Sequence, residues 1–244
     1  MKVEYFNATH FLFLGIALVL FLGLFFSLKK IPENSKRKFL LYFSVANTLI
    51  FVVYKILETT VFGKTIESSI PLHLCNIMIF LMPFAFCFEK SWLRSIMFYI
   101  SIPGCVLALL FMDGWYVGVP ISNGSLWLYF IVHINLFVTS LLMVCLGLYK
   151  PKMSHAILNG IIIFAFAGLS HVVNVIFRAT NLVGNSNYFY TFGSKGNIAI
   201  NFFYKLIPIP LVFQIPLLAL AFGVFVFEAY ICKLCEKRRC GTQK

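Results

Sequence analysis

The stretch HFLFLGIALVLFLGLFFSLKK, residues 10–30, decides the fold class of this chain. Residues 11–28 carry no charged side chain, and two lysines follow them directly. An α-helix needs roughly 20 apolar residues to cross a bilayer core about 30 Å thick, so the stretch predicts a transmembrane helix. Only Lys2 and Glu4 carry charge before it, and no small-residue cleavage site is present. We therefore expect a retained helix and not a signal peptide.

The rest of the chain has the same apolar character. Of its 244 residues, 61% are hydrophobic and 11% are charged, and its mean hydropathy is +0.92. A soluble domain does not carry so much apolar surface, so the solvent is lipid. Because lipid cannot satisfy free backbone groups, the expected spanning element is a helix. We predict an all-α integral membrane protein, a single bundle domain over residues 1–244, with seven transmembrane helices at about 10–28, 38–57, 70–88, 92–112, 125–149, 155–177 and 206–232.

The basic residues predict the orientation of this bundle. Most of the 20 lysines and arginines lie in the loops after the first, third and fifth helices and in the tail after the seventh. Loops rich in Lys and Arg stay in the cytoplasm. We therefore predict an external N-terminus, a cytoplasmic C-terminus and a multi-pass protein of the cell membrane. This topology accounts for the formal net charge of +12, which indicates contact with anionic lipid headgroups and not with nucleic acid.

The sequence contains no recognisable motif for a cofactor or a metal. HxxxH and HExxH spacings do not occur, and neither does a motif for ATP or coenzyme A. Four of the seven cysteines lie in apolar stretches, which argues against a disulfide scaffold. Cys232 and Cys235 lie in a basic tail, where acylation or free thiols are expected. We predict no cofactor and no metal; zinc held by three histidines from different helices is the alternative. The oligomeric state stays open.

Polar residues inside the helices gather at one predicted depth. Ionisable groups in a membrane are costly and are functional candidates by default. Each has a plainer interpretation as an interfacial residue, an ion pair on one helix, or a packing contact between helices. Because several helices place them in the outer half of the membrane, we expect a shared polar cavity there, formed by His10, Lys55, Glu58, His73, Cys75, Asn76, His133, His171 and Asn174.

The segment PLHLCNI, residues 71–77, is the most polar start of any predicted helix. On an ideal helix His73 and Asn76 share a face, whereas Cys75 lies about 200° away from His73. Either the first turn is irregular at Pro71, or only one of the two side chains enters the site. The free amides of a first turn favour negative charge and a thiolate.

Two loops on the outer side are also informative. Residues 113–124, rich in Gly, Pro and aromatic residues, suit an interfacial turn. Residues 178–205 form the longest connection and are too aromatic to be disordered. We expect this loop to fold over the outer mouth as a lid or a re-entrant segment. Arg178 and Tyr188 are its candidate binding residues.

The order of these motifs resembles that of the YwaF-type bacterial membrane proteins. The resemblance rests on NATHFLFLG (7–15), PLHLCNI (71–77), FIVHINLF (130–137), VGNSNYFYTF (183–192) and LIPIPLVF (206–213). The YwaF-type family is in turn similar to the eukaryotic transmembrane protein 164 acyltransferases, which move a fatty acyl group between phospholipids with a Cys and a His. The resemblance implies that Cys75 and His133 are the counterparts. The eukaryotic motif places its cysteine immediately before a histidine, where this chain has Leu72.

Two main functions follow from these expectations. The first is a membrane lipid acyltransferase or transacylase, with phospholipids and lyso-lipids as partners. In it His133, His73 and Cys75 are catalytic, and Asn76, His10, His171, Asn174, Tyr188 and Arg178 bind substrate. His133 is the general base for either the Cys75 thiol or the hydroxyl of a lyso-lipid. The alternative is a transporter or a small-molecule binding protein with a histidine-lined outer cavity. A structural subunit of a larger complex is a third possibility.

Overall fold

The computed structural model describes the backbone of residues 1–65 and 70–241 and the side chains as far as residue 234. Ser68 and Ser69, which precede the polar segment at 71–77, lie outside this range. The described chain is helical, with an isolated β-bridge between Lys2 and Pro120. The elements in order are α1 (Ala8–Leu28), α2 (Glu33–Thr60), α4 (Leu74–Cys87), α5 (Ser91–Ile96), η1 (Met97–Ser101), α6 (Ile102–Leu110), η2 (Gly114–Tyr116), α7 (Gly124–Cys145), α8 (Met153–Ala179), η3 (Tyr188–Tyr190), α9 (Ile198–Leu206) and α10 (Gln214–Gly241).

Helices long and apolar enough to cross a membrane make up most of the molecule. Within the described ranges there are six: α1, α2, the run Ser91–Tyr116, α7, α8 and residues Gln214–Leu234 of α10. The prediction of an all-α membrane protein is confirmed. The third predicted segment, 70–88, is not among the six and forms a shorter apolar helix, Leu74–Cys87. Because α4 has 14 residues, it is about 21 Å long at 1.5 Å per residue, less than the bilayer core.

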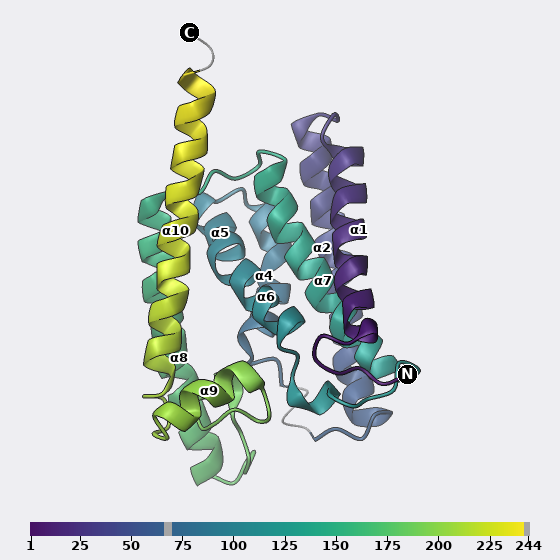
Figure 1. Ribbon diagram of the computed structural model, residues 1–244, viewed down its shortest axis with the longest axis vertical. Helices are drawn as coiled ribbons and strands as arrows, with labels where there is room; N and C mark the ends of the chain where they lie inside the picture. The colour runs from purple at the N-terminus through teal and green to yellow at the C-terminus, as the bar shows by residue number, and fades with distance from the viewer. Residues whose placement is uncertain (66–69, 242–244) are drawn as a thin grey trace.

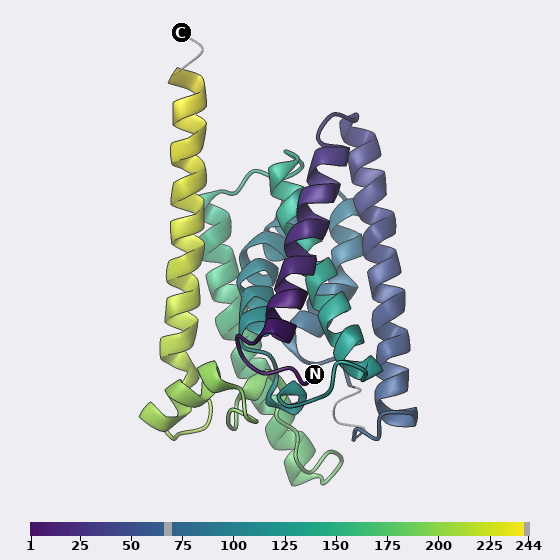
Figure 2. The ribbon, with the colours of Figure 1, turned by 45° about the vertical axis from the view of Figure 1, so that its right-hand side comes forward.

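Helix α7 is the centre of the bundle. It packs against α1, α2, α4 and α6, and Figures 1 and 2 show it behind α1 in both views. The rings of Phe13 on α1 and Phe130 on α7 stack with centroids 3.9 Å apart. On the other side α8 and α10 form a close pair (Figures 1 and 2). Gly160 makes this approach possible, because a side chain there would overlap the ring of Phe222.

The fourth predicted span is not a regular helix. It runs through α5, one π-helical turn (η1) and α6. Pro103 lies at the start of α6 and has no N–H to donate to the turn before it. A widened turn is a common solution to a missing helical bond, and such turns are frequent at functional sites. The irregular turn places Gly104 and Leu107 along the same wall of the bundle.

One end of the bundle is covered by loops, and we call it the loop-covered end. Figures 1 and 2 show the N-terminus, the loop around η2 and helix α9 gathered there, with the C-terminus at the opposite end. The N–H of Val3 donates to the carbonyl of Val119 (2.9 Å), and Gly118 donates to Val3 (2.7 Å). We call residues 180–206, which include η3 and α9, the lid. It lies over this end, as the predicted lid over the cavity mouth requires.

Candidate functional site

A cavity of about 260 Å³ lies beneath the lid. Its walls come from α2, α4, α6, α7, α8 and α10, and the lid contributes Phe189, Tyr190 and Asn197. The part toward the loop-covered end is polar and charged. The part between α6, α8 and α10 is apolar and includes Ile163, Leu218 and Phe225. One cavity therefore joins a charged region to a hydrocarbon-like one.

His73, Cys75 and Asn76 all line this cavity. His73 is the N-cap of α4, with extended backbone angles (φ −74°, ψ 146°), and the helix begins at Leu74. The 200° separation expected on an ideal helix therefore does not apply to His73 and Cys75. Of the two alternatives, the structure shows the irregular one: the chain turns into the helix after His73, and both side chains reach the same space.

The Cys75 thiol lies between two polar neighbours. Its neighbours are the side chains of His133 on α7 and Cys105 on α6. Gly104 leaves room for it, since a Cβ there would lie 3.8 Å from Cys75 Sγ. Cys75 and Cys105 are among the described cysteines that form no disulfide. The structure thus brings together the cysteine and the histidine that the sequence placed on different helices.

The hydrogen bonding of His133 fixes its tautomer. Its Nδ1 lies 2.7 Å from the carbonyl oxygen of Tyr129, one turn earlier on α7. A carbonyl only accepts, so Nδ1 carries the proton. In the neutral ring, Nε2 then keeps a free lone pair, and Cys75 lies beside the imidazole. This is the arrangement that a general base for a thiol requires. Asn135, two residues on, faces away and donates to Asn47 on α2 (3.1 Å).

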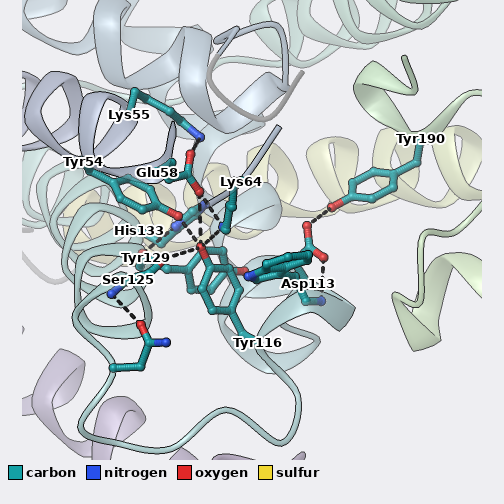
Figure 3. Close-up of polar contacts among 12 residues, drawn as sticks. Tyr54, Lys55, Glu58, Lys64, Asp113, Tyr116, Ser125, Tyr129, His133 and Tyr190 are labelled. Atoms are coloured by element: carbon teal, nitrogen blue, oxygen red, sulfur yellow. Dashed lines mark hydrogen bonds and ion pairs between the residues drawn. The ribbon is translucent and has the colours of Figure 1, made fainter. Parts of the chain in front are cut away.

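A charged cluster occupies the end of α2 (Figure 3). Lys55 and Lys64 each place Nζ 2.5 Å from one oxygen of Glu58. Lys64 also donates to the hydroxyl of Tyr116 (2.5 Å), which in turn contacts the hydroxyls of Tyr54 and Ser125. The side chains of Lys55, Glu58 and Lys64 are 15%, 2% and 8% exposed. Burial lowers the pKa of Lys64, but the attraction of Tyr116 and Glu58 outweighs it, and the net pKa is raised.

The lid connects to the cavity through His73 and Asp113. The rings of Tyr188 and Tyr190 lie 5.7 Å and 5.2 Å from the imidazole of His73. The hydroxyl of Tyr190 donates to Asp113 (3.1 Å), and the N–H of Trp115 donates to the other oxygen of that carboxylate (3.0 Å). Figure 3 shows Tyr190 reaching across to Asp113. Burial, and then the charge of Asp113, raise the pKa of Tyr190 well above its ordinary value.

The other predicted binding residues lie outside the lining of this cavity. Asn174 holds the lid: its amide donates to the carbonyl of Tyr188 and to Thr191, and accepts from the N–H of Tyr188, each at 2.9 Å. Arg178 donates to the carbonyl of Ser186 (2.8 Å). His171 contacts Thr191 and Phe192, and His10 contacts Phe6 and Leu109. All these contacts are internal to the protein, so substrate binding by Asn174, Arg178, His171 and His10 stays a prediction.

Sequence reasoning missed several residues of the site. Tyr54, Tyr116 and Tyr129 are aromatic residues in an aromatic-rich chain and carry no distinguishing signal. Lys64 and Asp113 lie in connections between predicted helices, where buried charge is not expected, although the structure buries Lys64 against Glu58. Asp113 had one usable signal. It is an acidic residue in a chain with 8 acidic residues, placed directly after an apolar span.

Comparison with known proteins gives one match. A model of the TMEM164 family matches residues 5–226. This range contains α1 through α9 and the first part of α10, and with them every residue that lines the cavity. No curated protein and no solved structure matches the chain.

Proposed function

The chain belongs to the TMEM164 family, and from this premise we propose that it is a lipid acyltransferase that moves a fatty acyl group from a phospholipid to a lyso-lipid. The observation that carries the proposal is the contact between the Cys75 thiol and the His133 imidazole inside a cavity with a charged end and an apolar end. Similarity to the YwaF-type bacterial proteins is part of the same proposal.

In the first half-reaction, His133 Nε2 takes the proton of the Cys75 thiol. The thiolate attacks the ester carbonyl of the donor lipid, and the resulting tetrahedral oxyanion collapses to a thioester on Cys75. The departing oxygen takes the proton from His133 and leaves as the hydroxyl of a lyso-lipid. The Tyr129 carbonyl keeps the ring oriented and stabilises the imidazolium formed in this step.

In the second half-reaction, the hydroxyl of the acceptor lyso-lipid gives its proton to His133 and attacks the thioester. The new ester forms as the Cys75 sulfur leaves and takes the proton back. The oxyanion of each step needs donors nearby. The free first-turn N–H groups of α4 and the side-chain amide of Asn76 are the groups in place for it. His73 packs between this turn and the lid tyrosines and positions the start of α4.

The proposed arrangement in the membrane has seven segments, with α4 as the short one, an external N-terminus and a cytoplasmic C-terminus in the cell membrane. It is supported by the distribution of lysines and arginines. Most of them lie just after α1 and in the start of α2, around the start of α5, after α7, and in the last part of α10. The loop-covered end and its cavity then belong to the outer half of the bilayer.

Trapping the thioester tests the chemistry directly. Purified protein incubated with a phospholipid carrying a labelled acyl chain is expected to acquire label that hydroxylamine releases. Cys75→Ala removes the label, whereas Cys87→Ala, at the exposed far end of α4, keeps it. Transfer to an added lyso-lipid is followed in the same samples. Absence of a labelled protein together with full transfer in Cys75→Ala would exclude Cys75 as the nucleophile.

A further inference from the structure

The cavity is too small to enclose a membrane lipid. Its volume is about 260 Å³, whereas sites that enclose a drug-sized molecule measure roughly 300–1,000 Å³. A phospholipid with two long acyl chains is larger than a drug-sized molecule. Most of a phospholipid bound here would therefore lie outside the cavity, and the cavity wall has to be open where the acyl chains leave it.

The lid closes the loop-covered end of the cavity. Asn197 is 8% exposed and donates to the carbonyl of Phe111 (2.7 Å). Tyr190, also in the lid, donates to Asp113 (3.1 Å). These two bonds tie the lid to the end of α6 and to the loop around η2. An opening for acyl chains is therefore expected in a side wall of the bundle.

The exposure of the lining residues shows where a side wall is open. Ile163 on α8 and Leu218 on α10 line the cavity and are 6% and 4% exposed. Among the described lining residues, Leu107 on α6 is the most exposed, at 39%. Leu217 and Ala221 on α10 also line the cavity and are half-buried. The cavity therefore reaches the surface of the bundle beside Leu107.

The space behind Leu107 is not filled by side chains. Gly104 lies three residues before Leu107 on α6, and residues at this spacing share a helix face. A Cβ on Gly104 would meet only the sulfur of Cys75 within 4 Å, at 3.8 Å, among the atoms that the structure describes. No side chain from α8 or α10 fills this space. The exposed Leu107 is thus connected to the Cys75 thiol through open space.

The surroundings of this opening are apolar. Helix α6 (Ile102–Leu110) carries no charged side chain, and neither do residues 214–227 of α10. Val106 on α6 and Leu220 on α10 are exposed on the outside of the bundle. Both helices belong to candidate membrane spans, so hydrocarbon surrounds the opening. A hydrated solute would lose its hydrogen bonds with water there, whereas an acyl chain is already in this medium.

We propose that the cavity opens sideways into the bilayer between α6 and α10, and that an acyl chain of a membrane lipid lies in this opening. We call the opening, lined by Leu107, Leu217 and Ala221, the lateral portal. The chain passes Gly104 on its way to the part of the cavity that Cys75 lines. Entry of an acyl chain does not depend on acyl transfer. That the entering chain is the one transferred rests on the proposed function.

Photocrosslinking tests whether an acyl chain enters. Cys75→Ala is reconstituted in phosphatidylcholine vesicles that contain a phosphatidylcholine with a diazirine on one acyl chain. After illumination, the labelled residues are mapped by mass spectrometry. We expect label on Ile163 and Leu218, which the surrounding lipid cannot reach, and on Leu169, which is 64% exposed on α8 and lies in that lipid. Label on Leu169 without label on Ile163 and Leu218 overturns the proposal.

Variants of the lateral portal test the route. Leu107→Trp narrows the portal and is expected to reduce label on Ile163 and Leu218 severalfold, with label on Leu169 unchanged. Leu169→Trp, the same kind of change on the outer surface of α8, is the matched control and should leave Ile163 and Leu218 labelled.

If Leu107→Trp does not fold, Gly104→Leu, which fills the space behind the portal, is expected to have the same effect. Undiminished label on Ile163 and Leu218 in the folded variant would show that lipid enters elsewhere, and would overturn the portal. Because Cys75→Ala forms no thioester, failure of the proposed function would not produce either contrary result.

Discussion

His133 and His10 are both buried histidines on long helices, and their ring nitrogens are used differently. His10 accepts the N–H of Phe6 at Nδ1 (3.0 Å) and donates from Nε2 to the carbonyl of Leu109 (2.6 Å). His133 uses Nδ1 for its own helix, keeps Nε2 as an acceptor and lies beside the Cys75 thiol in the cavity. Sequence placed both residues at similar depth but could not separate them, because the difference lies in the neighbours that the fold brings to each ring.

The two histidines are therefore expected to respond differently to substitution. His133→Ala should lower acyl transfer by about 10²- to 10⁴-fold, the usual contribution of a general base, with the protein still folded. His10 lies outside the cavity lining and both its ring nitrogens have protein partners. Contrary to the substrate-binding role expected from the sequence, His10→Ala should therefore leave transfer by the folded protein nearly unchanged. It should destabilise the protein by about 1–3 kcal/mol, because a buried N–H and a buried carbonyl lose their partner. Transfer rates and thermal unfolding of both variants, measured side by side, check this. Equal loss of activity in the two would contradict it.

Lys64 is expected to make the stability of the folded protein depend on pH in the alkaline range. Its pKa in the folded protein is raised from an ordinary value of 10.5. A raised pKa means that the ion pair contributes fully below about pH 10.5, and that its contribution is lost as the pH rises through the folded-state pKa. As far as Lys64 is concerned, stability should therefore hold up to about pH 10.5 and fall as the pH rises further.

Comparing the wild-type protein with Lys64→Met isolates the contribution of the Lys64 ion pair to stability. The difference in unfolding temperature between the two proteins should be constant from pH 7 to 9 and should shrink at higher pH. Lys205→Met serves as the control with an exposed lysine. A difference that grows with rising pH would show that Lys64 is not charged in the folded protein.

Among the elements, α4 shows most clearly where sequence reasoning ended. The apolar run and Pro71 predicted a helix near residue 70, and the described helix begins at Leu74. The later start changes the relative directions of the His73 and Cys75 side chains, because His73 has an extended backbone and lies outside the helix. The short length of α4 also determines how deep Cys75 lies in the membrane. If its far end lies at the membrane surface, its 14 residues place Cys75 well below the opposite surface, since about 21 Å of helix cannot cross a 30 Å core.

The lid is attached to the loop around η2 by backbone packing. A Cβ on Gly114 would lie 2.9 Å from backbone atoms of Gly196, which itself has a positive φ of 84°. In addition, Asn197 donates to the carbonyl of Phe111 (2.7 Å). The lid residues Phe189 and Tyr190 have positive φ as well (56° and 58°), a conformation that costs about 1–2 kcal/mol per residue outside glycine. The lid is thus held in a strained form by its contacts.

Gly114→Ala should loosen the lid. We expect lower thermal stability and faster proteolysis within residues 180–197, because the added methyl group has rigid backbone opposite it. Gly168→Ala on α8 is the matched control: nothing lies within 4 Å of its Cβ, and alanine stabilises a helix interior by about 0.5–1 kcal/mol over glycine. Limited proteolysis and thermal unfolding distinguish the two. An intact, equally resistant lid in Gly114→Ala would show that this contact is not needed.

At the scale of the whole molecule, sequence predicted the helices well and their arrangement poorly. Each span needs a long apolar run, and lipid permits little else, so the segments could be read directly. The windows of α1 and α7 have similar hydropathy (2.8 and 2.1), yet 17% of one and 61% of the other is buried. Both faces of a membrane helix are apolar, so the pattern that marks the core of a soluble protein is weak. The gathering of polar residues at one end was predictable, because charge in lipid is costly wherever it lies.

The proposed orientation can be tested with single-cysteine proteins in intact cells. Cys87 lies exposed at the far end of α4, on the side predicted to be cytoplasmic. Leu182 in the lid is 71% exposed, on the predicted outer side. A membrane-impermeant maleimide should label Leu182→Cys in intact cells and Cys87 only after the membrane is opened. The reverse pattern would invert the bundle and place the cavity in the inner half of the bilayer.

The cavity has an apolar wall formed by helices α6, α8 and α10, all of which lie within the bilayer. Any ligand with acyl chains is already dissolved in that bilayer before it reaches the wall. Occupancy should then follow the mole fraction of the ligand among the lipids and not its amount per volume of water. Diluting a vesicle suspension with buffer would leave occupancy unchanged, whereas diluting the ligand with inert lipid would reduce it. For this protein, the ligand concentration that determines occupancy is therefore its mole fraction in the membrane.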